Sequence, residues 1–107
     1  MNNLNWADIN EALSSPIELQ TGKQKKWFRA SKERECIVIN IASNHLHSCV
    51  LSAPRAIREK EYTSIVPYYL RWISGDPGVR IHAQELSRNT TYLFALMDYL
   101  QNRNRLG

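Results

Sequence analysis

The fold of this 107-residue chain is decided by the stretch Cys36-Ile37-Val38-Ile39-Asn40-Ile41-Ala42. Four of these residues are Ile or Val, and apart from Asn40 both alternating faces of the stretch are apolar. Such residues pack well on a pleated sheet, and a strand that is apolar on both faces is typical of the interior of a sheet. The stretch therefore predicts a central strand formed by Ile37, Val38, Ile39 and Ile41.

Shorter strand patterns lie on both sides of this segment. Before it, Ile17 and Leu19 alternate with polar residues, Thr21-Gly22 supplies turn residues, and residues 26–29 have the composition of a second strand. After it, residues 45–52 have the composition of a returning strand that ends before Pro54. These patterns predict an antiparallel meander of three or four strands.

Helices are predicted on both sides of the sheet region. Asn5 is suited to cap a helix over 6–14, which Pro16 ends. An apolar stripe at helical spacing predicts a helix over 64–74 that covers the central strand, with Ser64 as its cap and Pro67 in its first turn. Residues 55–61 are predicted to form a separate short helix, or to join residues 64–74 in one kinked helix. The stripe consists of Tyr62, Ile65, Val66, Tyr69, Leu70 and Ile73.

The last predicted helix follows a loop at residues 75–78, is capped by Ser87 or Asn89, and runs to about residue 102. Its segment from Tyr92 to Leu100 is apolar on nearly every side, so it must be covered from several directions. Either a second subunit covers it, which makes a homodimer, or the helix lies centrally between the sheet and the other helices. The predicted fold is α+β, one domain over 1–107, with an N-terminal helix, the meander, and two or three C-terminal helices packed on one face.

Composition excludes several classes of protein. Hydrophobic residues make up 43% of the chain and charged residues 22%, which is ordinary for a globular domain and unlike a disordered one. No apolar run reaches the ~20 residues that cross a bilayer, and the N-terminus lacks the pattern of a signal peptide. We therefore expect a cytoplasmic protein that does not enter the membrane, with Cys36 and Cys49 as free thiols.

The sequence offers few groups for catalysis or for holding a cofactor. On a strand, His45, His47 and Cys49 would share one face and suit zinc, but no fourth ligand has a spacing that completes the site. There is no glycine-rich phosphate loop, and Glu59 and Glu61 lie in a charge-rich stretch typical of solvated surface. We expect no metal, no cofactor and no enzymatic activity.

Positive charge is concentrated in one segment. The formal net charge is +4, yet residues 1–20 contain no Lys or Arg, whereas residues 23–29 combine four cations with two aromatic rings. Cations contact phosphates and aromatic rings stack on bases, so this composition favours binding of DNA or RNA. The alternative is an edge strand that its lysines protect from aggregation. The candidate contacts are Lys25, Lys26, Trp27 and Arg29.

Residues 81–96 are similar to a helix-turn-helix, with Ala83 and Leu86 before a turn at Ser87 and an apolar helix after it. In this interpretation residues 89–92 begin a recognition helix and Arg88 becomes a fifth contact; the alternative is a helix cap before a core helix. The predicted function is a small basic accessory domain that binds nucleic acid without catalysis. The alternative is a protein–protein interaction module, an adaptor or inhibitor, that uses the C-terminal helical face.

Overall fold

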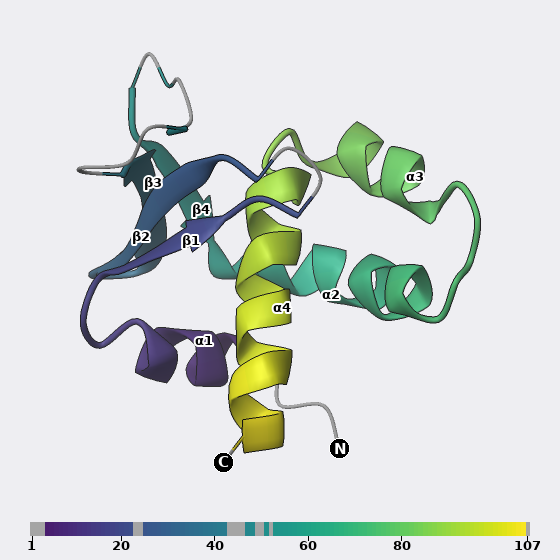
Figure 1. The fold of residues 1–107 in the computed structure, drawn as a ribbon, viewed down its shortest axis with the longest axis horizontal. Helices are drawn as coiled ribbons and strands as arrows, with labels where there is room; N and C mark the ends of the chain where they lie inside the picture. The colour runs from purple at the N-terminus through teal and green to yellow at the C-terminus, as the bar shows by residue number, and fades with distance from the viewer. Residues whose placement is uncertain (1–3, 23–24, 43–46, 49–50, 52, 107) are drawn as a thin grey trace.

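The computed structural model describes residues 4–22, 25–42, 47–48, 51 and 53–106. In this part of the chain the four strands form one antiparallel sheet in the order β1-β2-β3-β4, and the helices precede and follow it (Figure 1). The predicted α+β class, with an N-terminal helix, an antiparallel meander and C-terminal helices, is confirmed. The elements are α1 (Trp6–Ala12), β1 (Ile17–Gln20), β2 (Trp27–Glu33), β3 (Cys36–Ile41), β4 (Arg55–Arg58), α2 (Glu59–Ile73), α3 (Val79–Leu86) and α4 (Thr90–Leu106).

β3 is an interior strand, as the sequence predicts, because it pairs with β2 on one side and with β4 on the other. Ile37 and Ile39 are fully buried, whereas Val38 points to the opposite face of the sheet and is half-buried. Ile41, which we expected in the core, is 45% exposed. It lies beyond the last residue of β3 that pairs with β4, so among the four strands only β2 pairs with it.

The strand β4 lies in residues that we assigned to a short helix over 55–61, and that assignment is wrong. Ile57 is directly opposite Ile37 of β3, and both side chains are fully buried. The flanking residues Ala56 and Arg58 are exposed. A charge-rich segment therefore becomes a strand because its one large apolar side chain completes the core beside β3.

α2 begins earlier than the predicted helix over 64–74, directly after β4 and with Arg58 as its N-cap. Ser64 is not a cap, because its hydroxyl donates to the Glu61 carbonyl, 2.8 Å away, within the helix. Pro67 consequently lies inside the helix and not in its first turn. Since proline has no N–H, the Thr63 carbonyl one turn earlier lacks its usual helical donor.

α1 begins at the predicted position, and the residues around its N-terminus pack against the core. The Asn5 side chain accepts a hydrogen bond of 2.8 Å from the Asp8 backbone N–H. Leu4 and Ile9, on either side of this cap, are both buried. The N-terminal segment is thereby fixed against the helices that follow.

α4 is the central helix of the fold (Figure 1). Its Tyr92 meets Phe28 of β2 edge to face, with ring centroids 5.1 Å apart, and its Phe94 meets Tyr69 of α2 at 5.5 Å. α4 thus lies between the sheet and α2, so the stripe on α2 does not cover the sheet by itself. Of the two arrangements predicted for this helix, the structure shows the central one. Its buried residues are Tyr92, Leu93, Phe94, Ala95, Leu96, Met97 and Leu100.

No helix among the described residues combines the length and the apolar character that crossing a membrane requires.

The turn between β2 and β3 contains a strained residue. Glu33 pairs with Cys36, so Arg34 and Glu35 form the turn, and Arg34 has a φ of 48°. A left-handed residue with a side chain costs roughly 1–2 kcal/mol, and glycine costs roughly 0.5–1 kcal/mol in chain entropy. We therefore expect Arg34→Gly to raise the free energy of unfolding by about 0.5–1 kcal/mol in chemical denaturation. Glu35→Gly, at a position without positive φ, is expected to lower it; a loss in both variants would show that Arg34 is not strained.

Candidate nucleic-acid interface

One face of the sheet is not covered by any helix of the described chain. Along β2, Phe28 and Ala30 are buried on the helix side, whereas Arg29 between them is exposed on the other side. The register of the four strands extends this alternation across the sheet. We call the uncovered side the outer face. It is formed by Glu18, Gln20, Trp27, Arg29, Ser31, Glu33, Cys36, Val38, Asn40, Ala56 and Arg58.

Trp27 is half-buried at the start of β2, on the outer face. Its backbone N–H donates to the His47 carbonyl over 2.7 Å, and it forms an isolated parallel bridge with Ser48. On its other side it pairs with Gln20 of β1. The backbone of Trp27 is therefore paired on both sides, and this pairing fixes the position of its Cα atom on the outer face.

Arg29 is exposed in the middle of the outer face. Glu18 of β1 lies directly opposite it, and Asn40 of β3 lies opposite it on the other side. Opposite charges in directly facing positions attract one another, so Glu18 moderates the field of Arg29. A phosphate at this position would compete with Glu18 for the guanidinium.

Lys25 and Lys26 lie in the turn between β1 and β2, and both are exposed. Thr21 shapes this turn: its N–H donates to the Lys26 carbonyl over 2.9 Å, and its hydroxyl accepts from the Lys26 N–H over 3.1 Å. The Lys25 N–H donates to the Thr21 carbonyl over 3.0 Å, with Lys25 at a φ of 53°. The sequence predicts a turn at Thr21-Gly22 but does not indicate that the Thr21 hydroxyl fixes the backbone of Lys26.

Arg88 is exposed in the turn between α3 and α4. Figure 1 shows this turn and the adjoining ends of β1 and β2 at the N-terminal end of α4. Arg55 of β4 holds this turn, since its guanidinium donates to the Arg88 carbonyl over 3.4 Å and lies 5.5 Å from the centre of the Tyr92 ring. The Tyr92 ring in turn meets Phe28 near the start of β2. The structure therefore gathers Lys25, Lys26 and Arg88 at one end of the molecule, which we call the basic end, with Arg29 on the adjoining outer face.

The prediction of a recognition helix at residues 89–92 is wrong. Asn89 and Thr90 are 5% and 0% exposed, and Tyr92 is buried as well. The Thr90 hydroxyl donates to the Ser87 carbonyl over 2.7 Å, and the Ser87 hydroxyl accepts from the Asn89 N–H over 3.0 Å. These bonds make the segment the cap of a core helix, which was the alternative, and leave it without access to base edges.

Glu61 is half-buried and hydrogen-bonded, so its assignment to solvated surface is also wrong. Its carboxylate accepts from the Ser87 hydroxyl and, over 2.9 Å, from the Asn89 side-chain amide. Asn89 in turn accepts from Arg55 over 3.2 Å. This partly buried network joins α2, β4 and the turn before α4. No local pattern reveals it, because its hydrogen bonds join residues that are 26 to 34 positions apart in the sequence.

The candidate zinc ligands fall largely on residues whose placement the structure does not describe. His45 and Cys49 lie outside the described residues, and His47 is exposed. Within the part of the chain that the structure describes, no three His, Cys, Asp or Glu side chains are placed to hold a metal ion. Cys36 is a half-buried free thiol.

The candidate interface thus combines the outer face around Trp27 and Arg29 with the cations of the basic end. It is assigned from the residues of this chain alone. The chain matches no protein-family model, no curated protein and no solved structure.

Proposed function

We propose that the protein is a small non-catalytic domain that binds DNA or RNA with the outer face of its sheet and its basic end. The observation that carries this proposal is the position of Trp27 and Arg29 on a face that no described helix covers, beside a turn with two exposed lysines. Aromatic rings within reach of bases, next to cations within reach of phosphates, are typical of proteins that bind single strands.

Charge supports this use of the surface. The chain carries a formal charge of +4, and Lys25, Lys26 and Arg88 are exposed at the same end of the molecule. Contacts to phosphates supply most of the affinity for nucleic acid and carry no sequence information. The predicted recognition segment at residues 89–92 is largely buried in the cap of α4, so we expect binding with little sequence preference.

Binding should weaken steeply as salt rises, because phosphate contacts release counterions. Replacing Lys25 and Lys26 by Ala is expected to lower the slope of log affinity against log salt by about two units. Trp27→Ala is expected to weaken binding of a single strand by ~1–3 kcal/mol, through loss of base stacking. Filter binding of a single-stranded oligonucleotide and of its duplex, over a salt series, measures both effects.

A matched control variant distinguishes loss of specific phosphate contacts at the basic end from the general effect of lowering the net charge. Lys32 near the end of β2 and Lys60 in the first turn of α2 are exposed. Both lie at the end of the sheet opposite to the turn that contains Lys25 and Lys26. Replacing both by Ala changes the net charge by the same amount as the Lys25/Lys26 variant. An equal change of slope in the two variants would contradict a site at the basic end. Failure of the wild-type protein to retain any single strand or duplex at low salt would contradict the proposed function.

A protein–protein interaction module is the second candidate, and α3 is the feature that favours it. Ile81 and Leu86 of α3 are 63% and 58% exposed. Large exposed apolar side chains are available for contact with another protein. Between Tyr92 and Leu100 the apolar residues of α4 are buried within the chain, apart from the half-buried Tyr99, so a homodimer through this segment is not part of either proposal.

A further inference from the structure

A second pair of cations borders the outer face, at the end of the sheet opposite to the basic end. Arg34 lies in the turn between β2 and β3, and Arg58 is the last residue of β4, directly opposite Cys36. Both arginines line one hollow of about 490 Å³, which we call the far hollow. Its other lining residues are Glu33, Glu35 and Cys36. The fold thus brings two cations from separate elements to one place.

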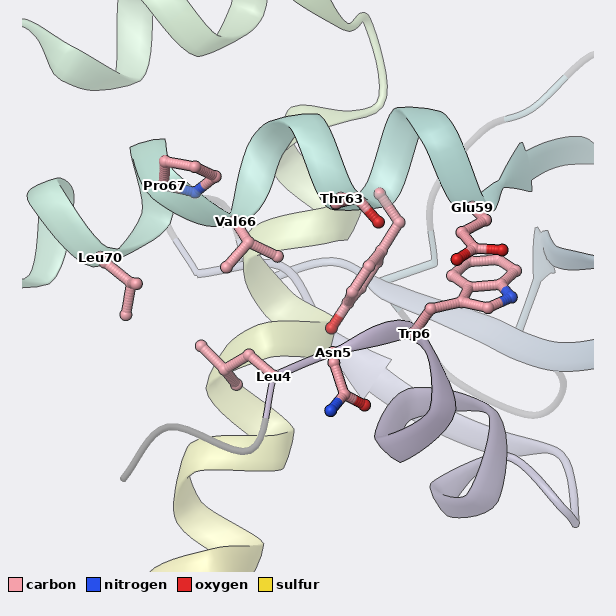
Figure 2. Close-up of a pocket in the computed structure, with 9 residues that line it drawn as sticks. Leu4, Asn5, Trp6, Glu59, Thr63, Val66, Pro67 and Leu70 are labelled. Carbon is pink, nitrogen blue, oxygen red and sulfur yellow. The ribbon is translucent and has the colours of Figure 1, made fainter.

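The guanidinium groups of the far hollow are not paired within the part of the chain that the structure describes. Arg34 and Arg58 are exposed, and their side chains form no hydrogen bond or ion pair with a described residue, although two glutamates line the same hollow. Glu59, which follows Arg58, does not line it, and Figure 2 shows the Glu59 carboxylate at the Trp6 ring. Both guanidinium groups are therefore available to an anion, and their planar forks suit the oxygens of a phosphate.

The backbone of Arg34 supports a role for its side chain outside folding. Its φ of 48° is in the left-handed region, which glycine adopts at lower cost. Strained residues of this kind cluster at binding and active sites, where a function offsets the cost. The Arg34 side chain does not compensate the strain through a hydrogen bond or ion pair with any residue that the structure describes. Binding of a ligand in the far hollow accounts for an arginine at this position.

The part of the outer face between Arg29 and the far hollow has neither charge nor a large side chain among its described residues. It consists of Ser31, Val38 and Ala56, which lie in one row across β2, β3 and β4. From Trp27 to the end of β2 the face extends over about 20 Å, at ~3.3 Å per residue. At about 3.4 Å per nucleotide, a single strand of about six nucleotides covers this length. One strand is therefore able to contact both ends of the outer face.

We propose that a single strand stacked on Trp27 continues across the outer face and that one of its phosphates binds Arg34 and Arg58 in the far hollow. This inference rests on the proposed function and specifies its ligand. The ligand is a single strand of at least about six nucleotides and not a duplex, whose bases are stacked on one another and do not reach the Trp27 ring. Glu33 and Glu35 balance the charge of the two arginines, so the contact depends on the geometry of the guanidinium groups and not on net charge alone.

NMR titration with a twelve-nucleotide oligothymidylate at low salt tests whether one strand contacts both ends. The backbone amides of Arg34, Glu35 and Cys36 are expected to shift with the same dissociation constant as the Trp27 indole N–H. Shifts at Trp27 without shifts at the far hollow, or two different dissociation constants, would overturn this inference and leave the proposed function intact. The absence of shifts at both places would contradict the proposed function as well.

Arg34→Gly separates binding from folding. It is expected to stabilise the fold, because it relieves the strain, and yet to weaken binding of the oligothymidylate about three- to tenfold, a loss typical of a charge-assisted hydrogen bond at an exposed site. Since this variant is expected to be more stable than the wild type, its weaker binding would not arise from unfolding. Arg58→Ala is expected to weaken binding by a similar factor. Unchanged affinity in both variants, measured by fluorescence anisotropy of the labelled strand, would overturn the proposal.

The variant that replaces Lys32 and Lys60 by Ala is the control for charge at this end of the sheet. It removes two cations, as does the combination of Arg34→Gly with Arg58→Ala. Lys32, however, alternates with the outer-face residues of β2 and lies on the helix side of the sheet. The combined arginine variant is therefore expected to lose more affinity than the lysine variant. Equal losses would mean that net charge and not the far hollow determines binding, and would overturn the proposal.

Discussion

Ile39→Ala is expected to lower the free energy of unfolding by about 2–4 kcal/mol, as is typical when a fully buried aliphatic side chain is truncated. Ile39 is 0% exposed and lies between Ala30 of β2 and Arg55 of β4. Neither neighbour is able to fill the resulting cavity, because alanine is small and the Arg55 guanidinium is bound to Asn89 and to the Arg88 carbonyl. Urea denaturation followed by circular dichroism measures the loss.

Ile41→Ala is the matched control for this prediction. It makes the same substitution in the same strand, at a side chain that is 45% exposed. Its cost is expected to stay below about 1 kcal/mol, since much less apolar surface is lost from the core. Equal costs for the two substitutions would contradict the placement of Ile39 at the centre of the core.

The parts of the fold that the sequence predicted correctly are those that local patterns specify. The run of β-branched residues around Ile37 and Ile39 identified the interior strand, and Asn5 identified the start of α1. β4 was missed because residues 55–58 have no local strand pattern apart from Ile57. That residue becomes part of a strand through its pairing with Ile37, twenty residues earlier in the chain, and no pattern within four residues encodes such a partner.

The candidate interface was predictable only in part, for the same reason. Composition identified residues 26–29 as a strand, and the structure buries Phe28 in the core and exposes Arg29 on the opposite face. The lysines, however, belong to the turn that Thr21 organises and not to the strand. Arg55, which connects the basic end to α4, contacts Asn89 across 34 residues of sequence. Contacts at such separation depend on the packing of α4, which composition and periodicity do not specify.

Glu61→Ala is expected to lower the free energy of unfolding by about 2–4 kcal/mol. The carboxylate accepts hydrogen bonds from Ser87 and Asn89, and each hydrogen bond to a charged group contributes roughly 1.5–3 kcal/mol, reduced here because Glu61 is partly exposed. Ser87 and Asn89 are each 5% exposed, so water does not readily replace the lost acceptor. Chemical denaturation measures the change.

Glu59→Ala provides the control, because Glu59 lies in the same first turn of α2 but is exposed. Both substitutions remove a favourable charge near the helix N-terminus, an effect of about 0.3–1 kcal/mol. The excess loss in Glu61→Ala therefore measures the contribution of the hydrogen bonds to Ser87 and Asn89. Combining Glu61→Ala with Asn89→Ala is expected to cost less than the sum of the two single changes, because each removes a partner of the other. Strict additivity would mean that the two side chains do not interact, and the turn before α4 would then be held by its own cap and by Arg55 alone.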